Sequence, residues 1–257
     1  GAVKALGGMQ ETAAPAIPEL VKNLNHWDEN LRRELVEAFG QIGKPAVQPL
    51  QEALGSPDAK ARQTAARALA AIGRPAAEPA AARVLELADR EQDAEVKAAA
   101  LTTLPLIGAA PDQAAPVAFR NLGHADEKVR FAAENALLTS RAYGEKALPL
   151  LIKDLGHSDA TVRRRAAKVI GGMHSRAASA VPVLIERARK EPGDAAYTTA
   201  LSEIGKPALA PLMKELTSAS EKDLASRQWV FRALKEMGTP ALEALAPVLD
   251  SKEPAVR

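Results

Sequence analysis

The chain has 257 residues, of which 47% are hydrophobic and only 3% aromatic, and this aliphatic composition suits thin, closely packed helices better than a sheet sandwich. Its 34 basic and 32 acidic residues give a formal net charge of +2, which excludes a strong whole-molecule field for gathering nucleic acid. The absence of cysteine excludes disulfides and fits a reducing or an oxidising compartment, so the cytoplasm, the periplasm and secretion are all compatible with the sequence.

A pattern that opens with an aspartate recurs along the whole chain. Complete units are predicted to begin at Asp28, Asp58, Asp93, Asp126, Asp159, near residue 191 (a degenerate unit) and at Asp223. The segments 1–27 and 251–257 are partial units. Steps of about 30–35 residues are typical of solenoids, in which each unit buries its apolar face against its neighbours. We therefore expect residues 1–257 to form a single all-α solenoid of about seven full units.

Each unit contains two apolar stripes with helical spacing. The first follows an aspartate, two variable residues, an apolar residue and an arginine or lysine, as in DATVR at 159–163. It ends at a glycine-containing turn such as LAAIG at 69–73, where glycine readily adopts the left-handed conformation. The second often has proline near its start, as in KALPLLIKDL at 146–155, where a missing N–H costs no helical hydrogen bond. Each unit is predicted to be helix, turn, helix.

Two signatures carry a resemblance to a known family. D-x-x-V-R occurs at 126–130 and 159–163, and A-L-x-x-I-G at 68–73 and 200–205. They resemble HEAT repeats, and most closely the short bacterial HEAT-like repeats of the phycobilisome-lyase type. The units are shorter than the ~40–47 residues usual in HEAT and armadillo arrays. The resemblance covers nearly the whole chain and implies an α-α superhelix of stacked units.

The aspartate and the arginine of each signature are predicted to be architectural. The aspartate carboxylate can accept the unpaired N–H groups of the first helical turn. The arginine faces the positive end of the helix dipole and therefore calls for a carboxylate, the nearest being the turn aspartates. The resemblance implies an inter-repeat ladder, and a ligand-binding row of arginines is the alternative. The ladder consists of Asp28, Arg32, Asp58, Arg62, Asp93, Lys97, Asp126, Arg130, Asp159, Arg163, Asp223 and Arg227.

The degenerate unit, KEPGDAAYTTALSEIG at 190–205, departs from this pattern. When it is aligned backwards from Gly205, Asp194 falls where the other units have arginine. Pro192 and Gly193 shorten the start of the helix. We expect the ladder to break at this unit.

Histidine occupies the turn just before the aspartate at His26, His124 and His157, and His174 is the fourth histidine. A metal shared by His124 and His157 is the alternative to a structural role in the turn. Adjacent units are ~10 Å apart, too far for two ligands that each lie about 2 Å from one zinc. No histidine is followed by glutamate, so the His-Glu pairs of deoxyhypusine hydroxylase, a metal enzyme built on similar repeats, are missing. We predict no metal ligands.

Catalytic motifs are missing from the sequence. There is no H-E-x-x-H, no phosphate-binding glycine loop after a strand and no G-x-S-x-G. Phycobilisome lyases share the repeat signature but need particular partners and a pigment, and nothing here identifies one. We expect a protein that is not an enzyme, with no catalytic residues and no cofactor. Catalysis by acidic residues that converge from several repeats is the alternative.

The repeat that opens at Asp159, which is the sixth when the partial unit 1–27 is counted as the first, is locally basic. The only acidic residue counted in this repeat is Glu186, whereas the basic residues are Arg163, Arg164, Arg165, Lys168, Arg176, Arg187, Arg189 and Lys190. This cluster is the basis of an alternative function, a nucleic-acid-binding array that resembles the alkylpurine glycosylases built on HEAT-like repeats. Successive residues of a helix point about 100° apart, so we expect these charges to be split between surfaces. Aromatic residues for base stacking are sparse.

The second helices are expected to line the concave side of the array, with their non-core positions forming columns. The predicted partner-binding residues are Lys22, Asn23, Glu52, Arg83, Arg120, Asn121, Lys153, Asp154, Glu186, Arg187, Lys214 and Glu215. Charges of both signs suit a protein surface or a peptide better than a phosphate backbone, which requires a consistently basic row. The leading function is therefore a scaffold or adaptor that binds a partner protein or peptide along the concave face. A merely solvated surface is the alternative.

Neither end of the sequence has the polar-faced capping repeat of a finished solenoid. AVKALGGM at 2–9 aligns with the end of a first helix, and DSKEPAVR at 250–257 stops at the arginine of a further signature. We expect the chain to be an internal piece of a longer array, with ends that favour end-to-end self-association. No apolar run reaches the roughly 18 residues that span a bilayer, so we expect no membrane insertion.

Overall fold

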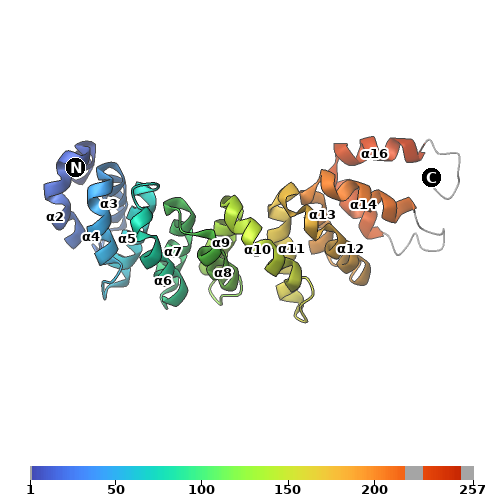
Figure 1. Ribbon diagram of the computed structural model, residues 1–257, viewed down its shortest axis with the longest axis horizontal. Helices are drawn as coiled ribbons and strands as arrows, with labels where there is room; N and C mark the ends of the chain where they lie inside the picture. The colour runs from blue at the N-terminus through green and yellow to red at the C-terminus, as the bar shows by residue number, and fades with distance from the viewer. Residues whose placement is uncertain (1, 218–227, 250–257) are drawn as a thin grey trace. The chain divides into compact units, whose positions relative to one another are not determined.

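The computed structural model describes residues 2–217 and 228–249, and every regular element in these ranges is a helix (Figure 1). The all-α fold expected from the sequence is confirmed. None of the helices in these ranges has both the length and the apolar character that crossing a membrane requires.

Two series of helices alternate along the chain. The first helices of the repeats are α1 (Ala2–Gly8), α3 (Glu29–Ile42), α5 (Ala59–Ile72), α7 (Ala94–Ile107), α9 (Glu127–Thr139), α11 (Ala160–Gly172), α13 (Ala195–Ile204) and α15 (Gln228–Met237). The second helices are α2 (Ile17–Lys22), α4 (Val47–Ala53), α6 (Ala81–Arg90), α8 (Pro111–Asn121), α10 (Arg141–Asp154), α12 (Val181–Lys190), α14 (Lys206–Thr217) and α16 (Thr239–Leu249). Short 3-10 helices lead into four of them: η1 (Gln10–Ala16), η2 (Lys44–Ala46), η3 (Glu78–Ala80) and η4 (His174–Ala180).

The helices group into two compact units, residues 1–146 (unit 1) and residues 147–257 (unit 2), and the division falls inside α10. Within unit 1 the helices follow one another in chain order from α2 to α9 (Figure 1). The single continuous solenoid expected from the sequence stays a prediction.

Glycine ends several first helices as the sequence predicts. Gly73 follows α5 with a φ of 66°, and Gly108 follows α7 with a φ of 79°, a backbone conformation that favours glycine. The backbone N–H of Gly73 donates to the carbonyl oxygen of Leu69 at 3.0 Å, so the turn satisfies one of the last carbonyls of the helix.

Small residues allow the first helices to approach one another closely. A Cβ atom added to Gly7 in α1 would lie 2.9 Å from the Cα of Ala38 in α3. In unit 2, a Cβ atom on Gly171 would lie 3.0 Å from the Cα of Ala200. At these distances the two backbones are nearly in contact, so one additional methyl group requires the helices to move apart.

The two series of helices are unequally spaced in unit 1. The first helices α3, α5, α7 and α9 pack directly against one another, whereas the second helices α2, α4, α6 and α8 touch more sparsely. The expectation that the second helices line the concave side stays a prediction.

Consecutive first helices run in the same direction. Near the start of α5, the side chain of Gln63 donates to a carboxylate oxygen of Glu95 in α7 at 3.3 Å. Further along both helices, the hydroxyl of Thr103 donates to the carbonyl oxygen of Ala66 at 3.1 Å. Equivalent positions of successive repeats therefore lie side by side on one surface.

The core of each unit lies between its two rows of helices. Fully buried aliphatic and aromatic side chains from both rows of unit 1 include Leu35, Phe39, Leu50, Leu69, Val84 and Leu104. Full burial of such a side chain contributes about 1.5–3 kcal/mol. The hydroxyl of buried Tyr143 donates to the carbonyl oxygen of Ala109 at 2.9 Å, and burial raises the pKa of this tyrosine.

The alignment of the degenerate unit is wrong in one respect. Asp194 does not stand at the arginine position; its side chain accepts from the backbone N–H of Ala196 at 3.1 Å and so caps α13. The helix has 10 residues, compared with 13 in α11, because it begins only after Pro192 and Gly193. The residue four positions after this cap is the buried Thr198, so the repeat supplies no arginine of its own.

Candidate interaction surface

The aspartates that open the repeats cap the first helices, as predicted. The carboxylate of Asp58 accepts from the N–H groups of Lys60 and Ala61 at 2.8 and 3.2 Å. Asp28, Asp93, Asp126 and Asp159 accept in the same way, whereas Asp223 lies outside the described residues. Hydrogen bonds, first of all from Ala61 N–H, hold the pKa of Asp58 below its usual value.

The arginine of the signature binds carbonyl oxygens of its own turn. Arg62 donates to the carbonyl oxygens of Ser56 and Pro57 at 2.9 and 3.0 Å. Arg32, Arg130 and Arg163 donate to the two corresponding carbonyls, Lys97 reaches the carbonyl of Asp89, and Arg227 lies outside the described residues. The predicted pairing of these cations with the turn aspartates is therefore wrong among the described residues. The aspartate carboxylate is already bonded to helix N–H groups, and the carbonyls lie near the negative end of the preceding helix dipole.

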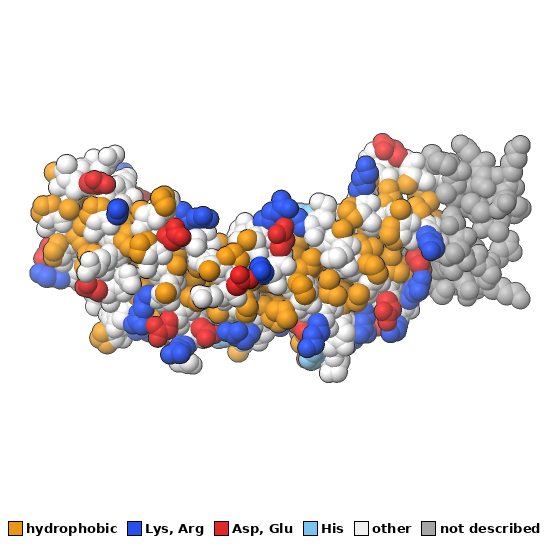
Figure 2. Space-filling view, in the orientation of Figure 1, with side chains coloured by type: hydrophobic (Ala, Val, Ile, Leu, Met, Phe, Trp, Pro, Cys, Tyr) orange, Lys and Arg blue, Asp and Glu red, His pale blue; other side chains and the backbone are white. Residues whose placement is uncertain are grey.

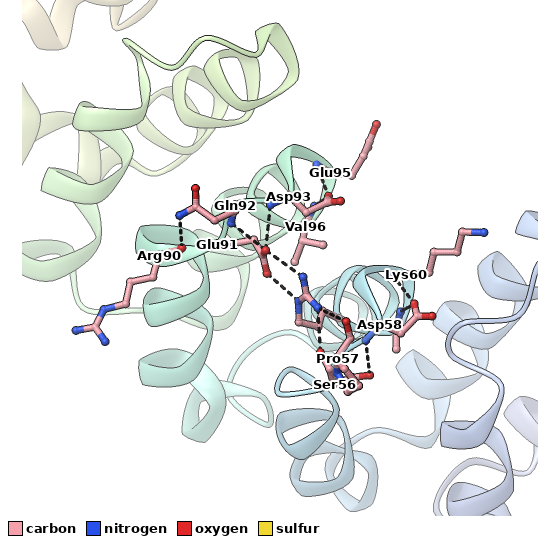
Figure 3. A network of polar contacts seen from close by, with 12 residues as sticks. Ser56, Pro57, Asp58, Lys60, Arg90, Glu91, Gln92, Asp93, Glu95 and Val96 are labelled. Atoms are coloured by element: carbon pink, nitrogen blue, oxygen red, sulfur yellow. Dashed lines mark hydrogen bonds and ion pairs between the residues drawn. The ribbon is translucent and has the colours of Figure 1, made fainter.

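The link between repeats is made by glutamate instead. In unit 1, Nε and Nη2 of Arg62 donate to the two carboxylate oxygens of Glu91 at 2.8 and 3.0 Å. Glu91 also accepts from the backbone N–H of Asp93 at 3.0 Å, so one carboxylate joins the arginine of one repeat to the cap of the next (Figure 3). Burial acts to raise the pKa of Glu91, but the hydrogen bonds from Arg62, Asp93 and Gln92 outweigh it and hold the pKa below its usual value.

Unit 2 contains a related link with an added tyrosine. Arg163 donates from Nη2 to Glu191 at 2.8 Å and from Nε to the hydroxyl of Tyr197 at 3.2 Å. The tyrosine hydroxyl donates to the same carboxylate at 3.2 Å. The hydrogen bond from Arg163 lowers the pKa of Glu191, and its pairing with Glu191 raises the pKa of the guanidinium. Sequence reasoning missed both partners because they lie in the irregular repeat.

The turn histidines serve the caps, which confirms their structural interpretation. Nδ1 of His26, His124 and His157 accepts from the backbone N–H of the aspartate at 3.1, 3.0 and 3.0 Å. The hydroxyl of Ser56 does the same for Asp58 at 3.2 Å. Because Nδ1 accepts, the proton of each neutral imidazole lies on Nε2. Among the described residues, no group of three or more potential ligands is placed to hold a metal ion.

The basic cluster of the sixth repeat is largely matched by carboxylates of unit 2. Its ion pairs are Arg163–Glu191, Arg164–Asp194, Arg187–Glu191, Arg189–Glu215 and Lys190–Glu186. Three of these four acids lie outside residues 163–190, the segment in which the basic cluster was counted. These pairs engage five of the eight basic residues, which reduces the positive charge that is available to phosphate groups.

The twelve residues of the predicted concave columns lie on or at the ends of second helices. Most are already engaged within their own unit: Arg83 pairs with Glu86, Arg120 with Asp89 and Lys22 with Glu19. The amide of Asn121 is buried and donates to the carbonyl oxygen of Val117 at 2.9 Å. Lys153 and Lys214 are exposed and have no ion pair among the described residues. Contact of these twelve residues with a partner stays a prediction.

The first helices of unit 1 carry a hollow that the sequence analysis missed. It has a volume of about 620 Å³ and is lined only by residues of α5, α7 and α9, including Arg67, Ala98, Thr102 and Phe131. Phe131 is 62% exposed. The available signal was the residue five positions after each aspartate, which is Arg33, Gln63, Ala98, Phe131 and Arg164 in successive repeats. A phenylalanine is out of place in that otherwise polar or small series.

Comparisons with known proteins agree with this architecture. The family model for HEAT repeats matches residues 17–105 and 115–196. Importin beta is 15% identical, with a TM-score of 0.55 over 96% of this chain and 40% of its own. Kap95p, from a structure describing its binding to RanGDP, is 13% identical with a TM-score of 0.56 over 93% of this chain and 38% of its own.

A third similar structure is the complex of CpcE and CpcF of phycocyanin lyase from a Nostoc species, at 24% identity and a TM-score of 0.42 over 93% of this chain and 87% of that one. This chain spans less than half the length of importin beta and of Kap95p, and a sequence search of curated proteins finds no match. The family match covers more than half of the chain and coincides with the capped helix pairs described above. The chain therefore belongs to the HEAT repeat family.

Proposed function

We propose that this chain is a non-enzymatic scaffold that holds a partner protein. The observation that carries the proposal is the mixed sign of its exposed charges. On the visible face of each unit, basic and acidic side chains are interspersed (Figure 2), and five of the eight basic residues counted in the sixth repeat are paired with carboxylates of unit 2. Such a surface suits a protein partner, whereas a nucleic acid requires many unpaired cations.

The second-helix columns are one proposed contact surface. Among the described residues Lys153 and Lys214 have no ion pair that an acidic residue of the partner would have to break. Arg83 and Arg120 already have carboxylate partners, so a new contact there must compete with an existing one. Kap95p, which has the same fold, binds RanGDP, and this supports a protein as the partner class.

The test is affinity capture from the native source, with and without nuclease treatment, followed by mass spectrometry. A scaffold retains its protein partners after nuclease treatment. Binding of the purified partner should fall by less than tenfold between about 50 and 200 mM salt, because phosphate-dominated binding loses ~10³–10⁵ over that range. Replacing Lys153 and Lys214 with glutamate should weaken binding to an acidic partner, with Lys4→Glu in the first helix of unit 1 as the matched control. Capture of nucleic acid with a steep loss in salt would establish the alternative function.

A further inference from the structure

The hollow on unit 1 is a trough with α7 as its floor. Ala98 and Thr102, which lie one turn apart on α7, line this floor. Leu106 lies one turn further along α7, beyond the hollow, and is 50% exposed. The floor is low because the side chains of Ala98 and Thr102 are short. Arg67 of α5 and Phe131 of α9 stand on opposite sides of it. The trough therefore presents apolar surface to solvent between a cation and an aromatic ring.

The charged side chains at the rim differ between the two ends of the trough. Glu95 and Lys128 pair with each other, so they cancel. Arg67 and Glu127 are exposed and have no ion pair among the described residues. Because the first helices run in the same direction, Glu127 lies at the end of the trough where the helices begin, and Arg67 lies about two turns, or ~12 Å, further along. One end of the trough is therefore negative and the other positive.

The walls of the trough favour a helical occupant. The floor and both walls are helices whose backbone N–H and C=O groups are bonded within the helix, so they offer no main-chain partners to an extended peptide. A helix satisfies its own backbone groups and needs only an apolar stripe to lay on the floor.

We propose that this trough docks an amphipathic helix of the partner protein, with apolar side chains against Phe131 and α7 and an acidic side chain against Arg67. A basic side chain about two turns later meets Glu127. An acid near the start of a helix and a base near its end are both favoured by the helix dipole, so the docked helix runs antiparallel to α7. This inference rests on the proposed scaffold function and names the chemistry of the partner segment.

The experiment selects binders from a phage-displayed library of 16-residue helical peptides against the purified chain. Enriched peptides are expected to share an apolar stripe, with an acidic residue about two turns before a basic one. Fluorescence anisotropy with the best peptide then compares variants. Phe131→Ala and Ala98→Arg, which fills the floor, should each weaken binding by about 10- to 30-fold. Arg67→Glu should weaken it as well, and changing the acidic residue of the peptide to lysine should restore binding to this variant.

The matched control is Phe231→Ala, which removes a phenylalanine of unit 2 that is 47% exposed and lies outside the trough. It should bind the peptide within about twofold of the unchanged chain. Phe131 is largely exposed, so equal melting temperatures will show that its loss leaves the fold intact. The proposal is overturned by a library that yields no enriched peptide, or by peptides that bind the Ala98→Arg variant as tightly as the unchanged chain. In that case a captured native protein would still uphold the scaffold function, whereas captured nucleic acid would remove it whatever the peptides do.

Discussion

Arg62 and Arg32 occupy the same position in two repeats of unit 1 but make different contacts. Arg62 binds two carbonyl oxygens of its own turn and also both carboxylate oxygens of Glu91 in the next repeat. Arg32 binds two carbonyl oxygens of its own turn, with no carboxylate partner among the described residues. The constant role of the signature arginine is therefore to close its own turn. The link to the next repeat is an addition that only some turns have.

Whether the arginine is linked to the next repeat depends on the residue two positions before the next aspartate. Ser56 accepts from the N–H of Asp58 with its only oxygen, and Glu91 accepts from the N–H of Asp93 with one of two. Only the glutamate has both the second oxygen and the reach to meet an arginine (Figure 3). Histidine at the same position, as in His124, likewise serves the cap without supplying a negative charge to the preceding repeat.

The largest expected effect comes from breaking the link at Glu91. The side chains of Arg62 and Glu91 are only 17% and 9% exposed, so Glu91→Ala leaves a mostly buried guanidinium without its carboxylate. We expect a loss of about 3 kcal/mol of unfolding free energy, measured by urea denaturation. Glu86→Ala is the matched control, because Glu86 is 45% exposed and makes only surface pairs, worth less than about 0.5 kcal/mol. Equal losses in both variants would show that the link does not stabilise the array.

The same link makes stability depend on pH. The pKa of Glu91 lies below its usual value near 4.5, so its contribution is present above pH 4.5 and is lost as the pH falls through the lowered value. The difference in stability between the unchanged chain and Glu91→Gln should therefore be largest near neutral pH and shrink in acid. A difference that stays constant down to about pH 3 would contradict this origin.

A second kind of link, close backbone packing, is tested at Gly171. A Cβ there meets the Cα of Ala200 at 3.0 Å, so Gly171→Ala should force α11 away from α13 and cost about 1–3 kcal/mol. Gly8→Ala is the control, because nothing lies within 4 Å of the added methyl group. Alanine has the higher helix propensity, so this control should be neutral or stabilising. Thermal melting of both variants distinguishes packing from propensity.

Much of this fold could be predicted from the sequence because it depends on local patterns. The period of the repeat, the apolar stripes, the aspartate caps and the terminal glycines each act within one turn or one helix. The arginine partners could not be predicted, because Glu91 lies 29 residues from Arg62 and has no fixed place in the signature. Asp194 was misplaced because counting back from Gly205 assumes a helix of regular length, and α13 is short.

The candidate surface was harder to predict than the fold. How closely neighbouring helices approach depends on small residues that meet across the interface, and pairs such as Gly7 and Ala38 are only visible in three dimensions. The ion pairs of the sixth repeat likewise join Arg164 and Arg189 to acids that the local count left out. The sequence did contain Phe131, but its meaning depends on the short side chains of α7 beside it.

Replacing the capping residue Asp194 should cause a smaller loss of stability, which can be compared with the loss at a regular repeat. Its side chain is 12% exposed and bonds both Ala196 N–H and Arg164. We expect Asp194→Ala to cost about 1 kcal/mol or more, and Asp194→Asn to cost less, since asparagine is a good N-cap. Asp93→Ala in a regular repeat serves as the reference. If urea denaturation finds Asp194→Ala as stable as the unchanged chain, Asp194 does not stabilise α13 as an N-cap.

The smallest effect should follow from moving the link to a turn that lacks one. Ser56 stands where Glu91 stands in the next repeat, so Ser56→Glu can keep the bond to Asp58 N–H and offer its second oxygen to Arg32. We expect a gain of about 0.5 kcal/mol near neutral pH, because a partly exposed ion pair contributes little. Ser56→Gln is the control, since its neutral amide can accept from the same N–H. The gain of the glutamate over the glutamine should disappear in acid as the new carboxylate is protonated. If Ser56→Glu is no more stable than Ser56→Gln at pH 7, the position before the aspartate does not determine whether neighbouring repeats are linked.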